Sequence, residues 1–274
     1  MTTVLLVRHG LTAMTGPVLA GRTLGLGLDE RGRAQAAVLA QRLAPVPLAA
    51  IVSSPLDRCL QTAGTVAIGR PGPASPVVAN GQPPPGSTAP PALAAQPAVA
   101  GQAGLDGQAG LAGQEVLVDR RLIEVGYGDW TGRKLQDLAK EPLWSVVQQH
   151  PSAAVFPGEG GEALAATQAR AVAAVREWNA RLGDDAVWLA CSHGDVIKAV
   201  LADALGLHLD QFQRIVVDPC SVSVVNYLPT RPFVIRMNDT GGDVTALLPS
   251  KDKAGGEAGS AADAAVGGGS GPAG

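Results

Sequence analysis

The sequence predicts an α/β fold with a mostly parallel sheet, and three observations lead to this prediction. Short apolar runs such as Val4–Val7 and Ala186–Cys191 are typical of buried parallel strands, which carry apolar side chains on both faces. The segment Asp29–Leu43, which follows the first run, has apolar residues at helical spacing, so strands and helices alternate along the chain. Each run is followed by a histidine and a glycine, beginning at His9 and His193, where strand ends of open α/β sheets bind ligands.

Further elements follow from the same patterns. Ser54 is expected to cap a helix whose first position is Pro55, and Glu162 is expected in the first turn of a long helix that reaches Leu182. Lys198, one turn into the helix after His193, is expected at the surface. Other helices are expected at about 133–140, 143–150 and 196–205. Other strands are expected at 48–52, 116–118, 220–228 and 233–237, the last two antiparallel at the sheet edge.

Composition divides the 274 residues into an ordered domain and two segments of low complexity. The chain has 35 glycines and 21 prolines, and many of them fall between residues 70 and 115, a stretch with little apolar bulk. We therefore predict one domain over 1–250, interrupted by a flexible insertion at about 70–115. Residues 251–274, rich in Gly and Ala, are predicted to be a disordered tail.

Charge and cysteine content exclude several classes of protein. The net charge of −3 favours neither nucleic acid nor an anionic membrane as a partner. Cys59, Cys191 and Cys220 are odd in number and form no C-x-x-C pair, which argues against a disulfide framework and a zinc site; Cys191 is expected to be a core thiol. We find no signal peptide and no membrane span in the sequence, so a reducing cytoplasm is the expected compartment.

Four residues carry the chemistry that the sequence suggests. Arg8 offers a planar fork of donors suited to phosphate, and His9 offers a nitrogen for nucleophilic attack or proton transfer, unless both lie in a solvated loop. Arg58, near a helix N-terminus, opposes the helix dipole unless an anion binds there; a solvated helix charge is the alternative. Glu124 lies between apolar neighbours, and desolvation there would raise the pKa of its carboxyl group, which suits a general acid. The alternative is a solvated strand-edge carboxylate.

The sequence segments around these residues, taken together and in chain order, resemble those of the histidine phosphatase superfamily, also called phosphoglycerate mutase-like. Within it they resemble an actinobacterial branch of phosphomutases and phosphatases. The resemblance rests on segments 6–10, 53–63, 122–124, 128–132 and 192–194. It implies a three-layer α/β/α sandwich, with helices on both faces of a mostly parallel central sheet.

The resemblance also implies roles for the candidate residues. His9 would be the nucleophile that forms a phosphohistidine, with a backbone carbonyl on its other ring nitrogen to fix the tautomer. Arg8, Arg58 and His193 would form the phosphate pocket, and Glu124 would protonate the leaving oxygen. No metal and no other cofactor is expected, because protein cations would replace them.

Two further positions are candidate substrate contacts. Thr15 stands where the family often has an asparagine, so it can supply one hydrogen bond in place of the amide. Arg22 follows Gly21 where the family often has a Gln-Gly pair. Both positions depart from the family pattern, so their contact with a substrate is a prediction of its own.

The predicted function is a metal-independent phosphatase that hydrolyses phosphate monoesters of small molecules through a phosphohistidine on His9. A phosphoglycerate mutase-type phosphomutase is the first alternative, and it would need extra cations for a second phosphate. Between the acid loop (residues 122–132) and the last histidine block (residues 192–194) no two arginines are adjacent, and the cations considered are Arg133, Lys140, Arg170, Arg176 and Arg181. A non-catalytic module that binds a phospho-ligand is the second alternative. The sequence leaves open the substrate and the oligomeric state, for which a homodimer is one option.

Overall fold

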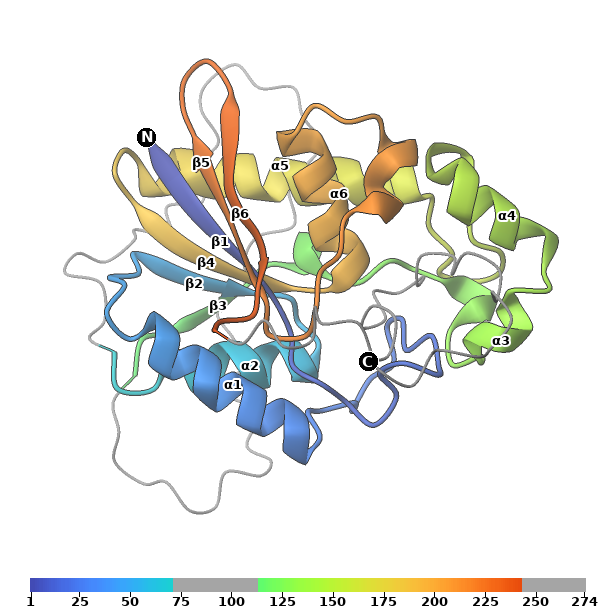
Figure 1. The fold of residues 1–274 in the computed structure, drawn as a ribbon, viewed down its shortest axis with the longest axis horizontal. Coiled ribbons are helices and arrows are strands. Elements are labelled where there is room, and N and C mark those ends of the chain that lie inside the picture. Colours follow the sequence, from blue (N-terminus) through green and yellow to red (C-terminus); the bar gives the residue numbers. More distant parts are fainter. Residues whose placement is uncertain (71–112, 243–274) are drawn as a thin grey trace, which may run out of the picture.

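Six strands form one mixed sheet in the part of the chain that the computed structural model describes, residues 1–70 and 113–242. The strand order is β3-β2-β4-β1-β5-β6 (Figure 1). The pairs β3–β2, β2–β4 and β4–β1 are parallel, whereas β5 and β6 form the antiparallel edge that was predicted. The strands are β1 (Thr2–Arg8), β2 (Ala50–Ser53), β3 (Val116–Val118), β4 (Val187–Ser192), β5 (Val222–Tyr227) and β6 (Pro232–Asp239).

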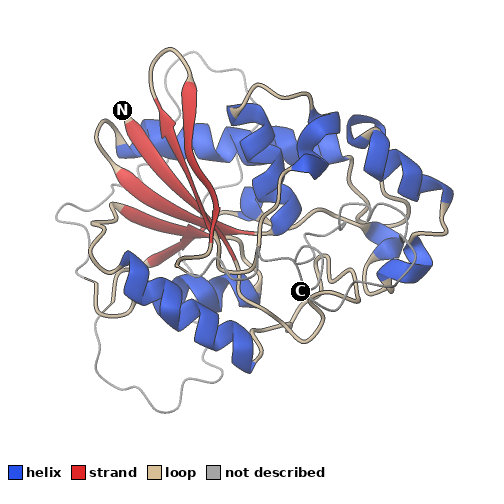
Figure 2. Cartoon of the chain, viewed as in Figure 1, coloured by secondary structure: helices blue, strands red, loops and turns tan. Residues whose placement is uncertain are grey.

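Helices cover both faces of this sheet, so the predicted three-layer sandwich is confirmed (Figure 2). The longer helices are α1 (Glu30–Leu43), α2 (Asp57–Ala67), α5 (Leu164–Leu182) and α6 (Gly194–Ala204). Helices α1 and α2 pack with Leu5 and Val7 on one face, and α5 and α6 pack with Val4 and Leu6 on the other. This alternation follows from the two-residue period of strand β1, whose apolar run therefore supplies both cores.

The shorter helices α3 (Leu135–Leu138) and α4 (Pro142–Gln149) lie beyond the end of the sheet (Figure 1). Pro142 is the first residue of α4, where its missing N–H costs nothing. The predicted insertion lies outside the described residues except at its two ends, and the predicted tail lies wholly outside them. None of the described helices combines the length and the apolar character needed to cross a bilayer.

Three local predictions were wrong. Ser54 does not cap α2, which begins at Asp57, because the Ser54 hydroxyl lies 2.8 Å from His193 Nε2 instead. Glu162 precedes α5, which begins at Leu164, since its carboxylate binds two arginine side chains. Lys198 is only 4% exposed, because its ammonium group pairs with the buried Asp195.

The strand ends meet at one edge of the sheet. Arg8 pairs with Ser192 in the β1–β4 register, and Ser53 pairs with Cys191 in the β2–β4 register. The residues that follow these strands therefore lie side by side. Gly10 is required at this edge, since a Cβ there would lie 2.7 Å from the carbonyl oxygen of Gly32.

Candidate active site

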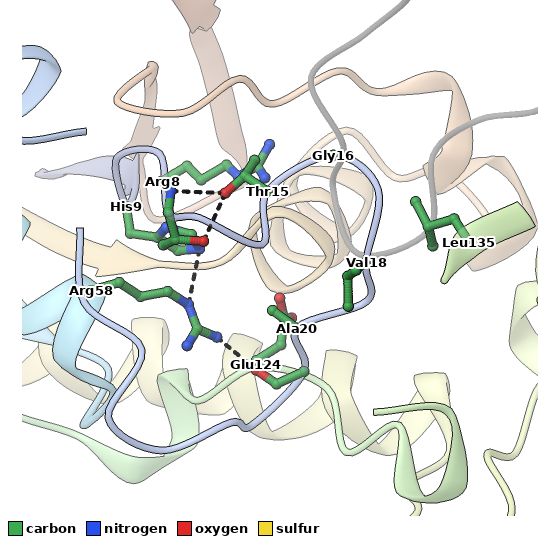
Figure 3. Close-up of a pocket in the computed structure, with 11 residues that line it drawn as sticks. Arg8, His9, Thr15, Gly16, Val18, Ala20, Arg58, Glu124 and Leu135 are labelled. Atoms are coloured by element: carbon green, nitrogen blue, oxygen red, sulfur yellow. Dashed lines mark hydrogen bonds between the residues drawn. The ribbon is translucent and has the colours of Figure 1, made fainter. Parts of the chain in front are cut away.

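His9 follows the last residue of β1 and is held in one tautomer. Its Nδ1 lies 2.7 Å from the carbonyl oxygen of Gly10, which can only accept, so Nδ1 carries the hydrogen and Nε2 keeps its lone pair. The Arg58 Nε donates to that Nε2 at 3.2 Å (Figure 3). Burial, then the charges of Arg58 and Arg8, hold the pKa of His9 well below its usual 6.5. The ring is therefore a neutral nucleophile at neutral pH.

His193 follows β4 and occupies the N-cap position of α6, and its side chain has no exposure. Its ring centroid lies 5.2 Å from that of His9, and its Nδ1 lies 3.4 Å from Arg58 Nη2. Burial, then the charge of Arg58, lowers the pKa of His193 well below its ordinary value. The two histidines that stand far apart in the sequence thus lie edge to face across one arginine.

Arg8 and Arg58 are 2% and 1% exposed, and each uses only part of its donor capacity. Arg8 Nη1 donates to the carbonyl of Val217 at 2.7 Å, and Arg58 Nη2 donates to the carbonyl of Gly21 at 2.6 Å. Arg8 Nε and Arg58 Nη1 are buried without a hydrogen-bond partner. Within the described residues neither guanidinium forms an ion pair. Two buried cations with donors to spare fit an oxyanion such as phosphate.

Glu124 lies after a 3₁₀ turn (Arg120–Leu122) and is 4% exposed, so the alternative of a solvated strand-edge residue was wrong. Its Oε1 accepts from the Val125 N–H at 2.9 Å, and its Oε2 lies 3.8 Å from His193 Nδ1. Burial raises the pKa of Glu124 to about 7, and the nearby Asp195 carboxylate adds to the effect. A carboxyl group that keeps its proton near neutral pH can act as a general acid.

A network of three charged side chains holds the backbone of this acid loop. Arg22 Nε and Arg170 Nη2 donate to the carbonyl oxygen of Glu124 at 2.8 and 3.2 Å. Glu162 pairs with both arginines at 2.7 Å and accepts from the N–H of Gly126 at 3.1 Å. No local pattern in the sequence predicts this role for Glu162 or Arg170, because each lies about 40 positions from Glu124 along the chain.

A pocket opens above His9, with Arg8, Arg58 and Glu124 on its wall (Figure 3). Its other lining residues carry no charge: Thr12, Thr15, Gly16, Val18, Ala20, Gly21 and Leu135. Thr15 Oγ1 accepts from the N–H of Thr12 at 3.0 Å, at the mouth of the pocket. Neither Arg22 nor His193 lines this pocket: Arg22 binds the acid loop, and His193 lies behind His9.

The described residues contain no cluster of three or more histidine, cysteine or carboxylate side chains that could bind a metal ion. The three cysteines are buried and unpaired. Cys59 Sγ lies 3.5 Å from His193 Nε2, next to the histidine pair. Burial raises the pKa of the Cys191 thiol, as expected for a core cysteine.

Comparison with known proteins agrees with this geometry. A family model for the histidine phosphatase superfamily (branch 1) matches residues 4–78 and 105–240. The chain belongs to the histidine phosphatase superfamily. This membership and the phosphatase names of similar proteins support a phosphoric monoester hydrolase.

Similar proteins come from several phosphatase groups. Phosphoserine phosphatase 1 from Hydrogenobacter thermophilus is 27% identical over 246 residues, which are 88% of this chain and 93% of that protein. The phosphoserine phosphatase from Entamoeba histolytica, solved with 3-phosphoglyceric acid, has a TM-score of 0.64 at 19% identity, covering 87% of this chain and 98% of that one. The alpha-ribazole phosphatase from Shigella flexneri has a TM-score of 0.61 at 20% identity, covering 88% of this chain and 98% of that one. The two structural likenesses establish the fold.

Proposed function

We propose that this protein hydrolyses small phosphate monoesters by attack of His9 Nε2 on phosphorus. Arg8 and Arg58, which line the pocket, are the proposed ligands of the phosphoryl oxygens, and His193, expected from the sequence to be a third ligand, contacts Arg58 through its Nδ1. As the N–P bond forms, the bond from phosphorus to the leaving oxygen breaks, and Glu124 gives that oxygen its proton. Water then attacks phosphorus and gives a proton back to Glu124, the N–P bond breaks, and inorganic phosphate leaves.

One observation carries this proposal: the unprotonated Nε2 of a neutral His9 accepts a hydrogen bond from Arg58, which has another buried donor left without a partner. The arginine pair is positioned to stabilise the negative charge of the transferring group without a metal. A module that only binds phospho-ligands would have no use for a buried, protonated Glu124 beside the nucleophile. These features favour turnover over binding alone.

Hydrolysis is favoured over a mutase reaction by the position of the remaining cations. Six cations lie between the acid loop and His193, none of them lines the pocket, and all but Lys134 pair with a carboxylate in the described residues. Their pairs are Arg133–Glu141, Lys140–Asp137, Arg170–Glu162, Arg176–Asp203 and Arg181–Glu177. No described cation beyond Arg8 and Arg58 is therefore placed in the pocket wall for a second phosphate.

Release of inorganic phosphate from an aryl phosphate in the presence of a chelator tests the proposal. The parent should release phosphate and His9→Ala should not, whereas His150→Ala, which changes an exposed histidine, should match the parent. Phosphoserine and 3-phosphoglycerate are the first natural esters to assay, since similar proteins act on or bind them. Equal release by the parent and His9→Ala would overturn the proposal, and conversion of 3-phosphoglycerate to its 2-isomer faster than phosphate release would favour a mutase.

A further inference from the structure

A second charged cluster, which the proposed reaction does not use, is buried directly behind the active site. Asp195 is the second residue of α6, two positions after His193, and its side chain has no exposure. The Tyr127 hydroxyl donates to Asp195 Oδ2 at 2.8 Å, and Lys198 Nζ lies 3.4 Å from Asp195 Oδ1. A buried ion pair of this kind seldom adds stability over apolar residues of the same size, so a functional reason is worth seeking.

The cluster is joined to Glu124 from two sides. Tyr127 belongs to the same loop as Glu124, three residues further along, and its hydrogen bond fastens that loop to Asp195. His193, which opens the helix that carries Asp195, has its Nδ1 3.8 Å from Glu124 Oε2. Both side chains are buried, with Asp195 0% and Glu124 4% exposed, so solvent screens the interaction between their charges very little.

The active site sets two opposing demands on Glu124. Arg8 and Arg58 must be cationic to hold phosphate, and their charges lower the pKa of Glu124, which favours loss of its proton. Burial raises the pKa of Glu124, and the repulsion from Asp195 raises it further. A nearby negative charge therefore adds to the effect of burial and helps a general acid beside two guanidinium groups to retain its proton at neutral pH.

We infer that Asp195 is a positioning residue whose buried negative charge, held by Tyr127 and Lys198, keeps Glu124 in its proton-donating form beside the two pocket arginines. The inference rests on the proposed function, in which Glu124 is the acid. Charged or titratable groups lie around the two carboxyl groups on several elements: Arg8 at the end of β1 and His9 directly after it, Arg58 on α2, Tyr127 on the acid loop, and His193 and Lys198 at α6. Arg22 and Arg170 bind the backbone carbonyl of Glu124.

The test compares a variant that removes the charge with one that removes only the hydrogen bond. Asp195→Asn combined with Lys198→Met deletes the ion pair without leaving a buried charge alone. Tyr127→Phe keeps both charges and frees the loop. In a plot of kcat/KM against pH, the alkaline limb is the fall in rate as Glu124 loses its proton. In the double variant this limb should lie about one pH unit lower than in the parent. Tyr127→Phe should lower kcat and leave the limb in place.

A second measurement needs no turnover. An infrared titration of the parent follows the band of a protonated carboxylic acid, and Glu124→Gln identifies it by its loss. The Glu124 band should persist to about pH 7, close to the alkaline limb of the parent. In the double variant it should disappear at lower pH.

The outcomes separate the inference from the proposed function. A parent without phosphatase activity would refute the proposed function, while the infrared titration would still report on Glu124. If the parent is active but the alkaline limb and the infrared band stay in place in the double variant, the role of the Asp195 charge is overturned. It is also overturned if both move equally in Tyr127→Phe. A parent band that titrates at the ordinary glutamate pKa of 4.5 would overturn it as well.

Discussion

Two pairs of arginines surround the catalytic centre, and they are held in opposite ways. Arg22 and Arg170 both pair with Glu162 at 2.7 Å and donate to the carbonyl of Glu124. Arg8 and Arg58 donate only to backbone carbonyls and to histidine nitrogens, and each keeps one buried nitrogen without a partner. The first pair has a protein carboxylate as its anion, and the second has none among the described residues.

This difference separates positioning from binding. A buried guanidinium without an anion is unfavourable, because its desolvation is not repaid by an opposite charge. The fold tolerates that cost only at the pocket, where a phosphoryl group would supply the charge. The same residue type thus serves the acid loop in one pair and, we propose, the substrate in the other.

Arg58→Met tests most directly whether the pocket arginines bind the phosphoryl group, and it has the largest expected effect. The variant loses the donors to the transferring group, so kcat/KM should fall about 10³-fold. The free energy of unfolding should stay level or increase, because a buried and unpaired cation is removed. Steady-state kinetics and chemical denaturation measure the two effects. A loss of activity below about tenfold would place Arg58 outside the binding pair.

Arg170→Met tests the other pair. Glu162 keeps Arg22, but the Glu124 carbonyl loses one of its two donors, so kcat should fall by about tenfold to a hundredfold with KM little changed. The free energy of unfolding should fall by about 1–3 kcal/mol, since a partly buried carboxylate loses a partner. A raised KM with an unchanged kcat would instead make Arg170 a substrate ligand.

The pH profile of kcat/KM tests the same difference between the arginines that hold the acid loop and those that line the pocket. Glu124 must be protonated to act, and its pKa is raised to about 7, so the rate should fall as the pH rises above neutrality, by about tenfold per pH unit. His9 should not limit the rate just below neutrality, since its pKa lies well below 6.5. Arg170→Met should leave the alkaline limb near pH 7, because Arg170 contacts the backbone carbonyl of Glu124 and not its carboxyl group. A limb that moves in this variant would contradict the separation.

Arg176→Met is the matched control and should have the smallest effect. Its guanidinium is 63% exposed and pairs with Asp203 at 3.0 Å, so it belongs to neither arginine pair. The free energy of unfolding should change by less than about 0.5 kcal/mol, and kcat/KM should stay within about twofold of the parent. A larger loss of activity would show that a charge outside the two arginine pairs also affects the reaction.

The strands were predictable because each consists of a short apolar run between polar or glycine-rich segments. The run at Val4–Val7 determines a two-faced buried strand whatever surrounds it. Helix starts were less predictable: Ser54 is a good capping residue by type, yet its hydroxyl lies against His193, 139 positions away. Burial of Arg58 and Lys198 was also hidden, since no local pattern shows that Arg58 lies against His9 or that Lys198 pairs with a buried Asp195.

The sequence by itself determined the alternation of strands and helices and the placement of His9 and His193 after strand ends, because these depend on local periodicity and on the chain direction. It also identified the nucleophile, acid and phosphate ligands as candidates through their order in the chain. Only the tertiary structure decided which arginines have a carboxylate partner, that Glu162 and Arg170 hold the acid loop, and that the buried Asp195 carboxylate raises the pKa of Glu124. These facts are long-range because desolvation and charge pairing depend on neighbours in space, which a linear pattern of residues does not record.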